Sequence, residues 1–123
     1  MKRDLELIRK MMLAIEDAPS GWAPWAQDLK FEGYTEAQVG YHAYLLIDAG
    51  LAKGEDASSM GGDSPIGIIR TLTWAGHEFA DAARDETRWR KAMGVVQEKG
   101  GTVTIGVLTQ LLAALMRGAF GLP

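Results

Sequence analysis

The chain has 123 residues, of which 47% are hydrophobic and 24% charged, as is typical of a globular domain and not of a disordered segment. Its formal net charge of −3 excludes a general electrostatic attraction to nucleic acid or anionic lipid, and the absence of cysteine excludes disulfides and thiolate chemistry. We expect a cytoplasmic protein without a membrane span, because the most apolar stretch, residues 103–116, is shorter than the roughly 20 residues that a spanning helix needs.

The first half of the chain predicts two helices separated by a connector. Residues 2–17 predict an amphipathic helix, because apolar side chains recur there at three- and four-residue steps. These side chains are Leu5, Ile8, Met12 and Ile15. The connector carries Trp22 and Trp25, and residues 28–32 alternate in the way of a short strand. A second helix is expected over residues 35–49, with Thr35 and Gln38 as a capping box and Gly50 at its end.

The second half predicts a hairpin followed by helices. Strands are expected over residues 51–53 and 66–72, joined by a mobile tip rich in glycine, serine and acidic residues. Thr73 is the expected cap of a helix over Trp74–Arg84, and further helices are expected over residues 85–98 and 105–117. Three aromatic side chains are expected in the core, and they are Trp74, Phe79 and Trp89.

This order of elements predicts an α+β, winged-helix-like fold. The order is helix, strand, helix and two-stranded wing, followed by two or three C-terminal helices. We expect a single domain over residues 1–123, with a core over residues 1–73 and a C-terminal helical extension over residues 74–123 that serves in dimerisation.

Several segments also carry a resemblance. They are residues 1–10, Gly33-Tyr34, Tyr41-His42 with Leu45-Leu46 and Ala49-Gly50-Leu51, residues 72–79, and Asp81, Arg84-Asp85, Thr87 and Trp89. In this combination, over about the first three-quarters of the chain, the sequence resembles a family of short, uncharacterised bacterial proteins often encoded in phages and prophages. The resemblance implies a winged-helix-like fold and a phage association. It transfers no catalytic residue, because the family is a domain of unknown function, and the chain departs from it in the connector, the wing tip and the last helix.

One function compatible with this fold is a DNA-binding transcriptional regulator. The helix over residues 35–49 would then enter the major groove, with Gln38, Tyr41 and His42 as base contacts and with Lys53 and Arg70 of the wing on phosphates. Affinity for DNA comes largely from Lys and Arg, however, and this helix has neither. A basic cluster lies elsewhere, at Arg84, Arg88 and Lys91; it is interpreted either as a solvated face with salt bridges or as a contact for phosphates or an acidic protein.

The sequence gives little indication of enzymatic chemistry. His77 and Asp81 lie four residues apart on one helix face, but two ligands without a third make a weak metal site. His42 is expected to be partly buried and bonded to a backbone carbonyl. We therefore expect no catalytic residue, no metal, no cofactor and no small-molecule substrate.

The apolar residues suggest contacts with proteins. Trp22 and Trp25 are interpreted either as a cover for the open end of the core or as an exposed aromatic patch for a partner. The last helix has a wide apolar stripe that predicts a homodimer through Leu108, Leu111, Leu112, Leu115, Met116 and Phe120. The main prediction is a non-enzymatic protein-interaction module, homodimeric, with an unidentified protein partner; the DNA-binding regulator is the alternative.

Overall fold

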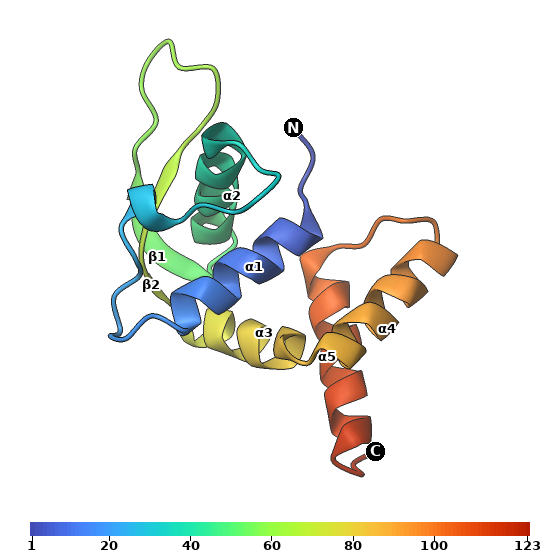
Figure 1. Ribbon diagram of the computed structural model, residues 1–123. Helices are drawn as coiled ribbons and strands as arrows, with labels where there is room; N and C mark the ends of the chain where they lie inside the picture. Colours follow the sequence, from blue (N-terminus) through green and yellow to red (C-terminus); the bar gives the residue numbers. More distant parts are fainter. The chain divides into compact units, whose positions relative to one another are not determined.

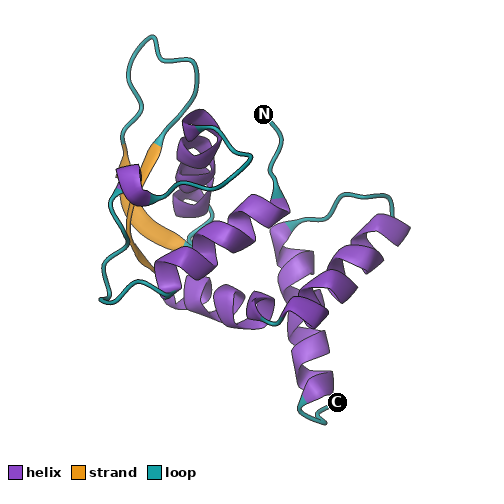
Figure 2. Cartoon of the chain, in the orientation of Figure 1, coloured by secondary structure: helices purple, strands orange, loops and turns teal.

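The computed structural model describes residues 1–123 and contains five α-helices, one 3₁₀ turn and a two-stranded antiparallel sheet (Figures 1 and 2). In chain order the elements are α1 (Leu5–Glu16), η1 (Ala26–Asp28), α2 (Glu36–Asp48), β1 (Ala52–Asp56), β2 (Gly67–Leu72), α3 (Trp74–Arg84), α4 (Glu86–Glu98) and α5 (Ile105–Ala119). The predicted α+β class is confirmed, as is the hairpin followed by C-terminal helices.

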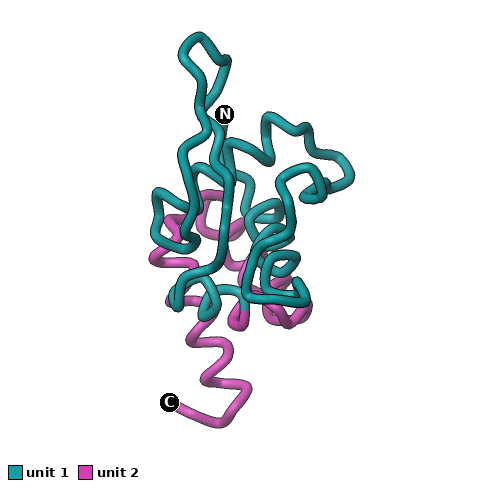
Figure 3. Tube along the Cα trace, turned by 90° about the vertical axis from the view of Figure 1, so that its left-hand side faces the viewer, with its two compact units in different colours: residues 1–80 teal, residues 81–123 magenta.

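The chain divides into two compact units, Met1–Ala80 and Asp81–Pro123 (Figure 3). The boundary falls inside α3. In the second unit α4 packs on α5, and the buried side chains of these helices are Trp89, Ala92 and Val96 of α4 and Leu108 and Leu112 of α5. The single-domain organisation with a C-terminal extension stays a prediction.

The first unit is built on the packing of α2 against both strands, with α1 packed against α2 and β2. This packing depends on glycine at Gly67, where a Cβ atom would lie only 2.5 Å from the backbone nitrogen of Tyr44. The buried side chains of α1 are Leu7, Ile8, Met11, Met12 and Ile15. The buried stripe of α1 is therefore broader than the spacing predicted and excludes Leu5, which is partly exposed.

Polar side chains cap most of the helices. The capping box of α2 is present as predicted, because Thr35 Oγ1 accepts from the N–H of Gln38 and Gln38 Oε1 accepts from the N–H of Thr35. Thr73 caps α3 by accepting from the N–H of Gly76. Asp4, Asp85 and Thr104 cap α1, α4 and α5 in the same way.

The prediction of a short strand over residues 28–32 is wrong. The chain there forms the 3₁₀ turn η1, in which the N–H of Leu29 donates to the carbonyl of Ala26, and a further turn in which the N–H of Tyr34 donates to the carbonyl of Phe31. A strand needs backbone partners on a neighbouring strand, and the sheet has only β1 and β2. The alternation also predicts that Leu29 and Phe31 point inward; Leu29 is buried, whereas Phe31 is only half-buried.

Candidate functional site

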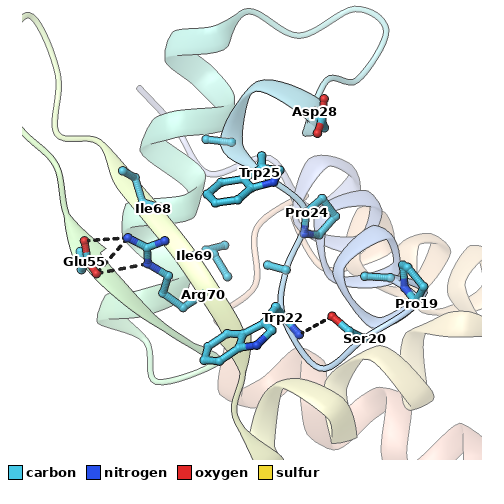
Figure 4. A pocket seen from close by; sticks show the side chains of 13 residues that line it. Pro19, Ser20, Trp22, Pro24, Trp25, Asp28, Glu55, Ile68, Ile69 and Arg70 are labelled. Carbon is cyan, nitrogen blue, oxygen red and sulfur yellow. Dashed lines mark hydrogen bonds and ion pairs between the residues drawn. The ribbon is translucent and has the colours of Figure 1, made fainter.

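A concave surface of the first unit lies between the connector, residues 17–35, and the solvent-facing side of β2 (Figure 4). Its volume is about 780 Å³. We call it the tryptophan groove, after the two indoles on its connector side. The residues that define it are Trp22, Pro24, Trp25, Asp28, Glu55, Ile68 and Arg70, with small apolar residues of the connector and Ile69 completing the lining.

Both indoles of the groove are exposed to solvent. Trp22 and Trp25 each expose 69% of their surface. The two indoles are therefore exposed as the interpretation of an aromatic patch requires and do not cover the core, whereas the partner of such a patch stays a prediction. The indoles are exposed because this part of the connector, which contains Pro19 and Pro24, forms neither a helix nor a strand. They therefore project beside β2 and do not pack into the core.

Two hydrogen bonds, one between backbone groups and one from a side chain, hold the connector against the outer edge of β2. The β1–β2 register shifts between Lys53 and Gly54, which leaves Arg70 without a partner residue in β1. The carbonyl of Arg70 instead accepts from the N–H of Ala23 at 2.8 Å, and Thr71 Oγ1 donates to the carbonyl of Gly21 at 2.8 Å. The two bonds flank Trp22 in sequence, so a bulge in the sheet fixes the position of the tryptophan segment.

The charged residues of the groove are mostly neutralised by one another. The Arg70 guanidinium donates from Nε to Glu55 Oε1 at 3.1 Å and from Nη2 to Glu55 Oε2 at 3.2 Å (Figure 4). This two-point geometry fixes Arg70 on the solvent-facing side of β2. The exposed carboxylate of Asp28 has no basic partner within the chain, so the lining carries two acidic groups and one basic group.

A second hollow of about 350 Å³ adjoins the groove along β2. The two share Pro24, Ala26, Ile68 and Ile69, and the second extends to α2 at Val39, Gly40 and Ala43. These shared residues are apolar, whereas the charged side chains of Lys30 and of Glu36 at the start of α2 also line the second hollow. The apolar surface therefore continues beyond the two indoles.

Two of the side chains predicted to contact DNA form hydrogen bonds within the fold instead. Gln38 uses its amide oxygen in the capping box of α2. His42 is 1% exposed; its Nδ1 lies 2.8 Å from the carbonyl of Gln38, and its Nε2 accepts from the N–H of Asp4 at 2.9 Å. Because a carbonyl can only accept and a backbone N–H can only donate, the ring is the neutral tautomer with its proton on Nδ1. The expected bond of His42 to a backbone carbonyl is confirmed, and its ring presents no free nitrogen to a base.

The other three predicted DNA contacts do not form a cationic surface. Tyr41 is half-buried and stacks on Tyr44 with a ring separation of 6.4 Å. Lys53 is exposed, but Arg70 is held by Glu55. The phosphate contacts expected on the wing are therefore reduced to one unpaired cation.

In the second unit the predicted basic cluster is only partly exposed. Arg84 and Lys91 are exposed, whereas Arg88 is half-buried and its Nε has no hydrogen-bond partner. The neighbouring Arg90 pairs with Glu86 at 3.5 Å, as the solvated-face interpretation expects. Neither interpretation of the cluster is settled by this geometry, and both stay predictions.

The residues predicted for a dimer interface divide into three groups. Leu108 and Leu112 are buried within the chain and are not available to a second copy. Leu111, Leu115 and Met116 are half-buried. Phe120 is 73% exposed, with Leu122 and Val107 also exposed. Any contact with a second copy would therefore use the outer side and the end of α5.

Two further sequence expectations concern α3. Trp74, expected in the core, is 82% exposed, and its indole N–H donates to Glu78 at 3.0 Å on the same helix. Its position in the first turn of α3 turns it to solvent, whereas Phe79 is buried as expected, and so is Trp89 of α4. His77 lies 2.9 Å from Glu16 of α1 and not in a cluster of three or more metal-ligating side chains.

Sequence reasoning missed most of the groove. Trp22 and Trp25 were singled out, but their association with Ile68, Glu55 and Arg70 was not. The two-residue period of a strand could have placed Ile68 on the same side of β2 as the polar Arg70. No sequence signal indicates the bulge at Arg70 that brings the connector to this side.

None of the helices combines the length and apolar character that crossing a bilayer requires. No solved structure matches the chain. An "Uncharacterized protein" of Haemophilus influenzae is 32% identical over 116 residues, which cover 94% of this chain and 96% of that relative. The family model described as a hypothetical protein, DUF2513, matches residues 2–102. The chain belongs to the DUF2513 family.

Proposed function

We propose that this protein is a non-enzymatic protein-interaction module of the cytoplasm, and that the tryptophan groove is its recognition surface. The observation that carries the proposal is the pair of indoles on the groove, each 69% exposed and held in place by the bonding of the connector to β2. Tryptophan is enriched at binding hot spots, and contiguous exposed apolar surface marks interaction sites.

The energetics favour apolar contact over ionic contact. Covering the exposed part of one indole would remove on the order of 150 Å² from water, which stabilises a complex by about 4 kcal/mol before ordering costs. The exposed Arg70–Glu55 pair contributes about 1 kcal/mol or less to any interaction at the surface. A partner would therefore gain most of its affinity from Trp22 and Trp25.

The proposal includes a homodimer through the exposed end of α5 and the phage or prophage association that the sequence resemblance implies. Phe120 and Leu122 supply exposed apolar surface there, close in sequence to the half-buried Leu115 and Met116. In this arrangement dimerisation and partner binding use different units of the chain. A variant that no longer dimerises would therefore still bind the partner, and a variant that no longer binds the partner would still dimerise.

The DNA-binding regulator remains the alternative, and the geometry supports it less. His42 and Gln38 are engaged within the fold, and Arg70 is paired with Glu55. Titration of a labelled mixed-sequence duplex with the protein at two salt concentrations tests this alternative directly. Binding that weakens steeply with salt would favour it, because release of counterions from phosphates produces that slope.

The proposed function is tested by selecting binders from a library of random displayed peptides on the full chain. Each selected peptide is then measured against a Trp22→Ala/Trp25→Ala variant and against Trp74→Ala, which removes an exposed tryptophan of α3 outside the groove. We expect peptides that bind the wild type and Trp74→Ala equally and the double variant at least about tenfold more weakly. Circular dichroism of the variants checks that the fold is kept. A selection that yields no groove-dependent binder contradicts the proposal.

A further inference from the structure

The tryptophan groove has features that narrow the chemistry of its partner. This inference rests on the function proposed above and goes further, because it names the conformation and composition of the bound segment. We infer that the groove binds a proline-rich segment of a partner protein in the polyproline II conformation, with prolines three residues apart and a basic residue beside them.

The sequence spacing of the two tryptophans equals the number of residues per turn of this conformation. Trp22 and Trp25 are three residues apart, so their Cα atoms are separated by at most about 11 Å. A polyproline II helix has three residues per turn and rises about 3.1 Å per residue, so rings on one side recur every 9 Å or so. This repeat lies within that limit, so the proposed segment places its prolines at positions i and i+3, one against each indole.

One residue of the connector has the same backbone conformation. Trp25 has φ −58° and ψ 148°, which are polyproline II values, and it follows Pro24. A segment in this conformation is already ordered before binding. A partner segment that is already in this conformation loses little conformational entropy on binding, which offsets the modest area of the contact.

The hydrogen-bonding groups of the groove also favour proline. The structure gives neither indole N–H of Trp22 or Trp25 a partner within the chain, whereas the indole of Trp74 donates to Glu78. An indole can only donate. A proline-rich segment suits such donors, because it presents carbonyls while its prolines have no N–H that would need an acceptor.

The charges of the groove indicate the basic neighbour. Glu55 and Arg70 neutralise each other, which leaves the exposed carboxylate of Asp28 as the unpaired charge of the lining. An acidic segment would meet this carboxylate and would find Arg70 already occupied. A lysine or arginine next to the prolines would instead gain a partner at Asp28.

The test uses a labelled, acetylated ten-residue peptide that contains Pro-x-x-Pro followed by one arginine. Binding to the full chain is followed by fluorescence anisotropy and by the shift of the tryptophan emission. Three comparison peptides carry alanine in place of both prolines, the second proline moved by one position, or glutamate in place of arginine. We expect the first peptide to bind with a Kd of about 100 μM or tighter and each comparison peptide to bind at least about fivefold more weakly.

Variants of the protein locate the contact. Trp22→Phe and Trp25→Phe keep a ring and remove the N–H, so we expect them to weaken binding less than the corresponding alanine variants. Asp28→Asn should reduce the preference for arginine over glutamate, and Trp74→Phe should change nothing. Equal binding of the proline and alanine peptides, or undiminished binding to the double alanine variant, would overturn the inference.

The two proposals fail in different ways. If the random library yields groove-dependent binders that lack proline, and the proline peptide does not bind, the polyproline inference is wrong and the interaction module stands. If neither the library nor the proline peptide gives groove-dependent binding, both are wrong.

Discussion

The backbone N–H of Asp4 donates to His42 Nε2 at 2.9 Å, which ties the start of α1 to a buried position in α2. The same Asp4 caps α1 through Oδ1, which accepts from the N–H of Leu7 at 3.0 Å and from the hydroxyl of Tyr34 at 3.1 Å. These bonds join three segments that are far apart in the chain. His42 is thus explained by the stability of the first unit and not by a ligand.

Replacing His42 with alanine is expected to destabilise the protein. The change removes two hydrogen bonds, leaves the N–H of Asp4 and the carbonyl of Gln38 without that partner, and empties a buried volume. We expect the free energy of unfolding in urea to fall by about 2–4 kcal/mol. His77→Ala is the matched control, because its ring is half exposed, and it should cost about 1 kcal/mol or less. Equal losses for the two variants would contradict this role of His42.

Two helical glycines should respond to alanine in opposite directions. At Gly76 of α3 an added Cβ would lie 2.0 Å from the carbonyl oxygen of Leu51, so the helix must move and the hairpin with it. At Gly94 of α4 nothing lies within 4 Å of the added atom. We expect Gly76→Ala to lower the unfolding temperature clearly, and Gly94→Ala to raise stability by about 0.5–1 kcal/mol because alanine is the better helix former. Calorimetry of both variants measures this, and a neutral Gly76→Ala would show that α3 does not pack closely against Leu51.

We expect the hydroxyl of Tyr34 to lose its proton at a higher pH than an ordinary tyrosine does. Burial, followed by the charge of Asp4 and its hydrogen bond, raises the pKa of the Tyr34 hydroxyl above the ordinary value of 10.0. A Tyr41→Phe/Tyr44→Phe variant leaves Tyr34 as the single tyrosine, and absorbance titration then reports its pKa. Asp4→Asn should bring this pKa down while keeping a good N-cap on α1. An unchanged pKa in Asp4→Asn would show that the carboxylate has no effect on the hydroxyl.

The same shift predicts a dependence of stability on pH. Because the pKa of Tyr34 is higher in the folded than in the unfolded chain, the folded state holds this proton more tightly. The contribution is therefore complete below about pH 10 and is lost as the pH rises through the folded pKa. Urea unfolding at neutral and alkaline pH should show a steeper loss for the wild type than for Tyr34→Phe. Equal losses of unfolding free energy in the two proteins would mean that Tyr34 does not contribute to the dependence of stability on pH.

The proposed dimer can be tested at Phe120. Phe120→Asp places a charge on the exposed end of α5, where a dimer contact would have to bury it. We expect light scattering after gel filtration at tens of micromolar to give a dimer for the wild type and a monomer for this variant. Met60→Asp in the loop between β1 and β2 is the control, since Met60 is fully exposed and belongs to the first unit of the chain. A monomeric wild type would remove the dimer from the proposed function.

The sequence by itself determined the helices and the presence of a hairpin, although β1 extends to Asp56, three residues beyond the expected end of its strand. The caps at Thr35, Thr73 and Asp85, and the glycine with positive φ at Gly50, involve residues no more than a few positions from the groups they satisfy. Helical periodicity is equally local. For this reason the bounds of α3 were predicted as observed, and those of α2 and α4 within one residue.

Only the tertiary structure decided which side chains face solvent and which face one another. Trp74 was expected in the core and is exposed. Residues 28–32 were expected to form a strand, but no neighbouring strand is present for them to pair with. The bond between Gly21 and Thr71 joins positions 50 residues apart, and it is bonds of this kind that place Trp22 and Trp25 beside Ile68. Local propensity carries no information about such partners, because burial and pairing depend on residues that become neighbours only when the chain folds.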